Sequence, residues 1–205
     1  MHMLTIYPAF HRAAVLQSIA IVDTVEGTDL GNATPCAGWD LADLLAHMTV
    51  QHRGFAASAR GAGADQGVWD PATVADAVRA DPAGSYRSAA GDALDAFGAP
   101  GIADVVFALP EFGAQATVPG SVAMSMHFVD YLVHGWDVAV SVGVPFAPSA
   151  DLVAAALPIV RSIPDDASRN DAGAPFGPAR PGGGWGDLDE VLRLLGRDPQ
   201  WRAPA

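Results

Sequence analysis

The chain reads His127-Phe-Val-Asp130-Tyr-Leu-Val-His134-Gly-Trp136-Asp137 in a segment that is otherwise apolar. Steps of three, four and seven residues return to nearly the same face of an α-helix, so His127, Asp130 and His134 would project together. Burying two imidazoles and a carboxylate among apolar side chains is costly unless they bind a metal, bind one another or face water. The segment therefore predicts a helix that carries a polar cluster with a role of its own.

The composition predicts a soluble protein and excludes some classes of partner. The 205 residues carry a formal net charge of −12, and all 11 basic residues are arginine. No basic stripe is present to face phosphates, so nucleic acid is not an expected partner. The apolar run at 13–22 is too short to span a bilayer and lacks the features of a signal peptide. With Cys36 as the single cysteine, we expect a cytoplasmic protein without an intrachain disulfide.

Hydrophobic periodicity predicts an all-α fold. Pro82 is expected to break one helical stretch and Pro158 to kink another, and Ser149 is the expected N-cap of the latter. Two short extended stretches flank a turn and predict a hairpin. The pattern favours an antiparallel bundle at 1–164 and a Pro/Gly-rich C-terminal extension at 165–205 that packs on it. The expected helices are 8–26, about 39–60, 71–97, 120–141, 149–163 and 188–195, and the expected hairpin arms are 104–109 and 115–118.

A second helix supplies a further candidate metal ligand. His47 shares a helix face with Leu44 and Met48, so it is expected to point toward the core. With Asp130 and His134 it would form a site of two histidines and one carboxylate, which suits zinc first and also nickel or iron. From spacing alone, a metal-free hydrogen-bonded network is an alternative interpretation of the three groups.

Other polar residues receive supporting roles in the sequence interpretation. His52 lies about 140° around its helix from His47 and is not expected to share a site with it. His127 is expected at the rim of the site or just behind the ligands. Asp137 is expected to turn away from the site and to cap or pair locally, for example with an arginine. Cys36 precedes the second helix; a reactive thiol is one interpretation, and a small residue that locks the loop is the preferred one.

Two stretches resemble the mycothiol-dependent maleylpyruvate isomerase N-terminal family. They are Thr34-Pro-Cys36-Ala-Gly38-Trp39-Asp-Leu-Ala-Asp43-Leu-Leu-Ala-His47 and His134-Gly-Trp136-Asp137-Val-Ala139. The C-terminal part, with Phe176-Gly-Pro and Leu194-Leu-Gly196-Arg197-Asp198-Pro199, is similar to a small actinobacterial subgroup of the family. The motifs follow one another in the same order over nearly the whole chain, which makes the resemblance more specific than any one motif.

The resemblance implies a DinB-like four-helix bundle whose metal ligands match His47, Asp130 and His134. Trp39 and Trp136 would then pack beside the site and support it. The resembled isomerase has glutamate at the position of Asp130, so the shorter aspartate implies a metal closer to this helix or an altered site. The isomerase also has a further C-terminal domain where this chain has a loop and one short helix, which argues against carrying over maleylpyruvate isomerisation itself.

The resemblance and the three-ligand pattern together predict a metal-dependent enzyme. Three protein ligands leave a position open for a thiol or water, and a divalent ion keeps a bound thiol as thiolate near neutral pH. The expected function is transfer of the low-molecular-weight thiol mycothiol to a small electrophile, or isomerisation of that electrophile. The alternatives are a small-molecule-binding bundle without catalysis and a hydrolase that uses metal-bound water. Small bundles often pair through exposed faces, so a homodimer is allowed but not required.

Overall fold

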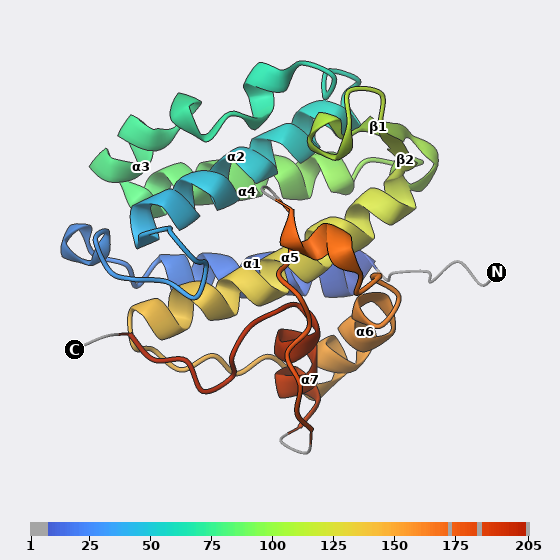
Figure 1. Ribbon diagram of the computed structural model, residues 1–205. Helices are drawn as coiled ribbons and strands as arrows, with labels where there is room; N and C mark the ends of the chain where they lie inside the picture. Colours follow the sequence, from blue (N-terminus) through green and yellow to red (C-terminus); the bar gives the residue numbers. More distant parts are fainter. Residues whose placement is uncertain (1–7, 172–173, 184–185, 204–205) are drawn as a thin grey trace.

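The computed structural model describes residues 8–171, 174–183 and 186–203, and most of these residues are helical (Figure 1). In chain order the helices are α1 (Pro8–Val22), α2 (Leu41–Ala59), α3 (Ala75–Ala80), α4 (Pro82–Phe97), α5 (Gly120–Ser141), α6 (Ala150–Val160) and α7 (Asp187–Leu194). Two short strands, β1 (Val106–Ala108) and β2 (Thr117–Pro119), pair antiparallel. The predicted helical class with a small β excursion is confirmed. Within the described ranges, no helix combines the length and apolarity that crossing a membrane requires.

Short polar motifs set where the helices begin. Asp40 caps α2 by accepting a hydrogen bond from the backbone N–H of Asp43, whose carboxylate accepts one from Asp40 in return. Asp81 and Pro82 separate α3 from α4, as the sequence predicts, because proline fits the first turn of a new helix but lacks the N–H that would extend the preceding one. Ser149 caps α6, also as predicted.

Two helices end earlier than the periodicity predicts. The helix α1 ends at Val22, although the sequence predicts an end at 26. Just beyond Val22, the Thr24 hydroxyl donates to the carbonyl oxygen of Ile21 and so competes with the backbone N–H groups that would continue the helix. The helix α6 continues through Pro158 and ends at Val160 rather than at 163, where the hydroxyl and the backbone N–H of Ser162 both donate to the carbonyl oxygen of Ile159.

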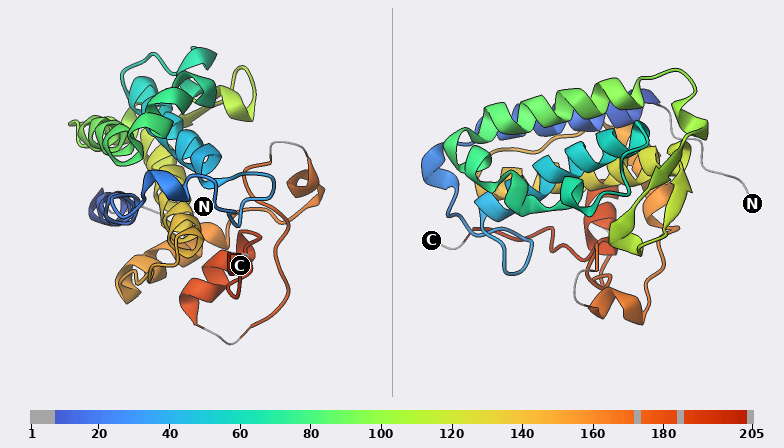
Figure 2. Two further views of the ribbon diagram at one scale, coloured as in Figure 1. Left: turned by 90° about the vertical axis from the view of Figure 1, so that its left-hand side faces the viewer. Right: turned by 90° about the horizontal axis from the view of Figure 1, so that it is seen from above.

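The long helices α1, α2, α4 and α5 pack together, and Figure 2 shows this group with α6 and α7 on one side of it. The helices α1 and α5 run in the same direction (Figure 1). The contacts show that α2 and α5 run in opposite directions. His52 hydrogen-bonds to His127, whereas His47, earlier on α2, meets His134, later on α5. This pairing brings side chains 75 or more positions apart in sequence to the same level of the bundle.

The β-hairpin closes one end of this helical group. The Ser58 hydroxyl, near the end of α2, donates to the carbonyl oxygen of Ala108 in β1. Gly120 begins α5 directly against the short helical turn Ile102–Asp104 that precedes β1, where a Cβ atom would lie 1.9 Å from the carbonyl oxygen of Ile102. Only glycine permits this close approach, which fixes the start of the helix that carries the polar cluster.

An arginine holds the C-terminal extension together. The buried Arg169 donates to the carbonyl oxygens of Pro164, Gly177 and Leu194, and so joins the loop to the last helix. The helix α7 packs on α6, and its apolar side chains share one core cluster with residues of α5. The extension therefore lies against the bundle, while the division of the chain into two units at residue 164 stays a prediction.

Candidate metal centre

His47, Asp130 and His134 offer ligand atoms that all lie within 4.8 Å of one another. His47 comes from α2, while Asp130 and His134 lie one turn apart on α5. Nε2 of His134 is 3.4 Å from Oδ1 of Asp130, and the two imidazole rings meet edge to face with centroids 5.3 Å apart. The structure thus brings together the three residues that the sequence analysis selected as ligands.

The cluster is open on one side. His134 is 4% exposed, whereas His47 and Asp130 are only half-buried, so the cluster faces outward between α2 and α5. Burial, reinforced by the positive charge on His134, lowers the pKa of His47 to about 4. His47 is therefore neutral near pH 7, and a neutral imidazole has the free lone pair that a metal ion requires.

His134 lies between two carboxylates. Its Nδ1 is 2.9 Å from Oδ2 of Asp137, and its Nε2 faces Asp130. Burial alone would lower the pKa of His134, but Asp130 and Asp137 outweigh it and raise the pKa to about 10. The prediction that Asp137 turns away from the site is wrong, because a residue three positions along a helix shares a face with the first.

Arg197 is the second partner of Asp137. Its Nη2 donates to Oδ2 at 2.9 Å and its Nε to Oδ1 at 3.4 Å, across 60 residues of sequence. Burial would raise the pKa of Asp137, but Arg197 and His134 lower it to about 2. The expectation that Asp137 pairs with an arginine is confirmed. The sequence did not indicate that this arginine is Arg197, because no local spacing connects positions 137 and 197.

Cys36 lies behind His134. Its Sγ is 3.4 Å from Oδ2 of Asp137 and 3.9 Å from Nδ1 of His134. Cys36, His134 and Asp137 also have ligand atoms within 4.8 Å of one another, but Nδ1 of His134 already bonds to Asp137, and Nη2 of Arg197 lies 3.7 Å from the sulfur. The guanidinium thus supplies the positive charge on this side, which leaves the Nε2 side of His134 as the place for a cation. The Cys36 carbonyl accepts from the Trp39 N–H, in keeping with a loop-locking residue.

His127 is not at the rim of this cluster. It is fully buried, with Nδ1 2.9 Å from Nε2 of His11 and Nε2 3.1 Å from Nδ1 of His52. The three imidazoles form a line inside the bundle, and Nε2 of His52 has no hydrogen-bond partner among the described residues. His11 was not predicted to take part, although its spacing from Val15 and Ser18 places all three on one buried helical stripe. As predicted, His52 does not share a site with His47.

The two tryptophans expected beside the ligands lie in different surroundings. The Trp39 ring lies 4.9 Å from the His47 ring and is 38% exposed, so it flanks the open side of the cluster. Trp136 is buried in the core cluster formed with α6 and α7. It stands two positions after His134 and hence on the other side of α5.

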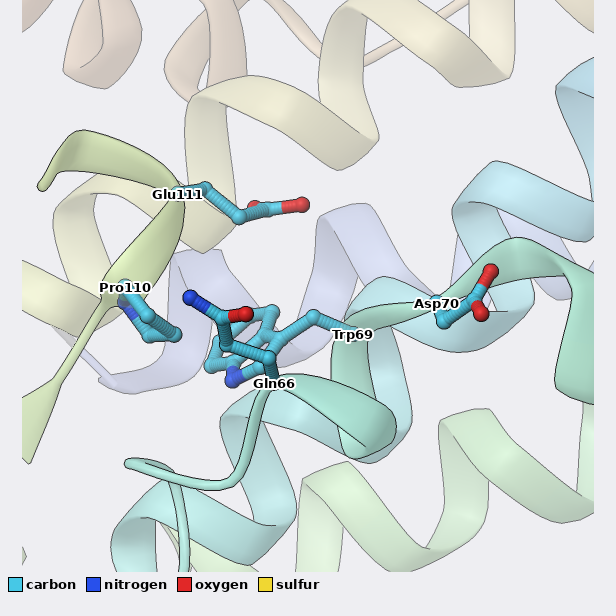
Figure 3. Close-up of a pocket in the computed structure, with 5 residues that line it drawn as sticks. All are labelled: Gln66, Trp69, Asp70, Pro110 and Glu111. Atoms are coloured by element: carbon cyan, nitrogen blue, oxygen red, sulfur yellow. The ribbon is translucent and has the colours of Figure 1, made fainter. Parts of the chain in front are cut away.

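Glu111 approaches the cluster from the turn between β1 and β2. Both of its carboxylate oxygens lie 2.8 Å from Nε2 of Gln51, one helical turn after His47. Burial, with the nearby charge of Asp130, raises the pKa of Glu111. No sequence pattern predicts a role for Glu111, because only the folded hairpin brings it to α2. Figure 3 shows Glu111 and Trp69 on opposite sides of a cavity of about 220 Å³, lined by Gln66, Trp69, Asp70, Pro110 and Glu111.

Comparisons with known proteins identify similar chains and folds. A family model described as the mycothiol maleylpyruvate isomerase N-terminal domain matches residues 11–139. Two uncharacterised proteins of Mycobacterium tuberculosis, Rv0738 of strain H37Rv and MT0763 of strain CDC 1551, are each 27% identical over 172 residues, which is 83% of this chain and 86% of the relative.

A solved structure supports the fold. The crystal structure of the mycothiol-dependent maleylpyruvate isomerase matches with a TM-score of 0.58 at 13% identity, over 75% of this chain and 65% of that one. At this identity the likeness shows the fold alone, and the predicted DinB-like fold is confirmed. The family match includes the three clustered residues of α2 and α5 but ends before the C-terminal extension.

Proposed function

Since the chain belongs to the mycothiol maleylpyruvate isomerase N-terminal domain family, we propose that His47, Asp130 and His134 bind a divalent metal ion. Zinc is the first candidate, and nickel or iron are the alternatives, because two imidazoles and a carboxylate suit these borderline ions. The family is named for a mycothiol-dependent isomerase, and the solved structure with the same fold is of such an isomerase, which supports a low-molecular-weight thiol as the cofactor.

The spacing of the donor atoms supports this proposal. Ligands at about 2.0–2.1 Å around a tetrahedral ion lie about 3.3 Å from one another. The 3.4 Å between Nε2 of His134 and Oδ1 of Asp130 matches that value, and the neutral His47 supplies the third donor. Asp137 accepts from Nδ1 of His134, and this directs the opposite nitrogen toward the proposed ion.

The proposed reaction is addition of the thiol to a small electrophile. A divalent ion held by His47, Asp130 and His134 would lower the pKa of a bound thiol and so supply a thiolate near neutral pH. In the proposed addition the thiolate sulfur would form a bond to the electrophilic carbon while the π bond at that carbon breaks, and its electron pair would move to the acceptor end, which takes up a proton. Retention of the adduct would be thiol transfer, whereas loss of that proton and of the thiol after rotation about the new single bond would be isomerisation. Trp39 flanks the entrance, and Glu111 with Gln51 provides a polar group one turn beyond His47. Cys36 acts as a support and not as the nucleophile, because its sulfur lies on the Nδ1 side of His134.

The single observation that carries the proposal is the convergence of the three donors at one open position between α2 and α5. Elemental analysis of the purified protein, followed by an assay of mycothiol consumption with maleylpyruvate and other small electrophiles, tests it. We expect the metal-loaded protein to consume thiol and His134→Ala to lose both metal and activity. His52→Asn is the matched control, since it alters a histidine of α2 outside the cluster. Equal activity in the loaded wild type and His134→Ala would refute the proposal.

The same measurements separate the alternatives. Activity without added thiol would indicate a hydrolase that uses metal-bound water. A protein that takes up no metal and consumes no thiol would indicate a binding bundle with a purely hydrogen-bonded cluster. We place the protein in the cytoplasm, because a reducing compartment keeps both the cofactor thiol and Cys36 reduced.

A further inference from the structure

Arg197 lies 58 residues beyond the end of the family match, which covers 11–139, yet its guanidinium reaches the side chain that orients His134. We infer that Arg197 is a positioning residue of the metal centre, and that metal binding and docking of the C-terminal segment 192–201 stabilise each other. This inference rests on the proposed metal site and adds to it a contribution from outside the matched domain.

The contact between Arg197 and Asp137 is specific in geometry. The guanidinium of Arg197 donates hydrogen bonds to both carboxylate oxygens of Asp137. Oδ2 accepts two hydrogen bonds, one from Nη2 of Arg197 and one from Nδ1 of His134, each at 2.9 Å. Asp137 is completely buried and Arg197 is 8% exposed, so water does not weaken the pair. This planar, bidentate hydrogen bonding fixes the plane of the Asp137 carboxylate, and the carboxylate in turn fixes the orientation of the His134 imidazole.

The position of Arg197 depends on how the C-terminal segment folds. Its backbone N–H donates to the carbonyl oxygen of Leu192, and Nη1 donates to that of Leu195. Gly196 has a positive φ of 82°, and a Cβ atom there would lie 2.9 Å from the carbonyl oxygen of Gly177. The segment therefore turns tightly after α7, and this turn directs Arg197 toward α5.

The geometry links two equilibria. When segment 192–201 is docked, Asp137 and the His134 ring are held in the orientation that presents Nε2 to Asp130. When the segment is displaced, the buried Asp137 carboxylate keeps its hydrogen bond to His134 but loses those to the Arg197 guanidinium. An ion that binds the oriented ring therefore favours the docked segment, and by thermodynamic reciprocity the docked segment favours the ion to the same extent.

Cobalt(II) titration of the full chain, followed by the d–d absorption spectrum, tests the first half of this inference. Arg197→Met removes the donors and the charge, and we expect a loss of affinity of about 10- to 100-fold, the range for partners behind a metal ligand. Arg197→Lys keeps the charge but loses the bidentate hydrogen bonding, so cobalt affinity should lie between those of Arg197→Met and the wild type, with a shifted spectrum. The matched control is Arg161→Met, which breaks an exposed ion pair between α6 and Glu190 of α7 and should leave affinity and spectrum unchanged.

Hydrogen exchange of the wild-type chain tests the second half. Amides of segment 192–201 should exchange more slowly when cobalt is bound, and in Arg197→Met this response should disappear. If Arg197→Met does not fold, the wild-type exchange decides: unchanged exchange in the segment on metal binding would overturn the inference.

The outcomes distinguish this inference from the proposal beneath it. A wild-type protein that binds no cobalt would refute the metal centre, and the inference with it. A wild type that binds cobalt, with a folded Arg197→Met of equal affinity and spectrum, would overturn only the role of Arg197.

Discussion

His134 and Asp137 form a hydrogen-bonded pair one helical turn apart, with Nδ1 2.9 Å from Oδ2 in the interior of the protein. The pair leaves Nε2 of His134 as the atom that faces Asp130. Because Asp137 also holds Arg197, one buried carboxylate connects the central helix of the bundle to the C-terminal segment. The orientation of His134 in the proposed metal centre and the packing of the extension therefore depend on the same side chain.

Asp137→Asn should strongly destabilise the fold. The amide keeps the shape of the carboxylate but leaves the buried guanidinium of Arg197 without its counter-charge, a change that costs about 3–5 kcal/mol. Urea unfolding of the metal-free protein measures this loss in the free energy of unfolding. Asp92→Asn is the control, because its ion pair with Arg60 is half exposed and should contribute less than about 1 kcal/mol. Similar losses in the two variants would contradict a buried, energetically important pair.

Metal binding at pH 6.5 should release about one proton per ion. The pKa of His134 is about 10 in the metal-free fold, so this ring is protonated at pH 6.5, whereas His47 has a pKa of about 4 and is already neutral. Apparent affinity should consequently rise about tenfold per pH unit below the pKa of His134. Calorimetric titration in two buffers with different ionisation enthalpies counts the protons. Binding without proton release would mean that His134 is not the titrating ligand.

The three proposed ligands could be predicted from the sequence, whereas the side chains that support them could not. His47, Asp130 and His134 are polar residues on otherwise apolar helix stripes, and helical periodicity predicts such stripes. Asp137 was assigned wrongly although its three-residue spacing from His134 was visible in the sequence. Arg197 could not have been found in this way, because it meets Asp137 across 60 residues through a turn whose path no local pattern encodes.

The buried histidine line shows the same limit. His127 was visible as a polar residue on the stripe of α5, but its partner His11 lies 116 positions away. Periodicity places each residue on the buried face of its own helix, and only the packing of α1 against α5 brings them into contact. The sequence therefore predicted a polar residue facing inward at 127 and assigned it to the wrong cluster.

Acid should destabilise the protein through this histidine line. Burial lowers the pKa of His11 to about 4 and holds those of His52 and His127 well below the ordinary value of about 6.5. The unfolded chain thus binds more protons, and stability falls as pH decreases from 6.5 toward 4, with a slope that approaches about 1.4 kcal/mol per pH unit for each histidine. His134 has the opposite sign, since its raised pKa of about 10 means that its contribution is lost as pH rises above 6.5.

Urea unfolding of the metal-free protein between pH 6.5 and 4.5 measures this slope. His11→Phe keeps a ring beside Phe97 and removes one titrating group, so its slope should be smaller by up to about 1.4 kcal/mol per pH unit. Asp137, with a pKa of about 2, titrates below this range and does not obscure the result. Identical slopes for the wild type and His11→Phe would show that His11 is not held neutral in the fold.

Two helical glycines should respond to alanine in opposite directions. At Gly54 of α2, a Cβ atom would lie 2.2 Å from the Trp69 ring, whose Nε1 donates to the carbonyl oxygen of Gly63 and holds the ring in place. Gly54→Ala must displace this anchored indole and should cost about 1–3 kcal/mol of unfolding free energy. At Gly91 of α4, no atom lies within 4 Å of the added Cβ, so Gly91→Ala should stabilise the protein by about 0.5–1 kcal/mol through its higher helix propensity. Thermal and urea unfolding compare both variants with the wild type, and a stabilising Gly54→Ala would show that the Trp69 ring yields more readily than its hydrogen bond indicates.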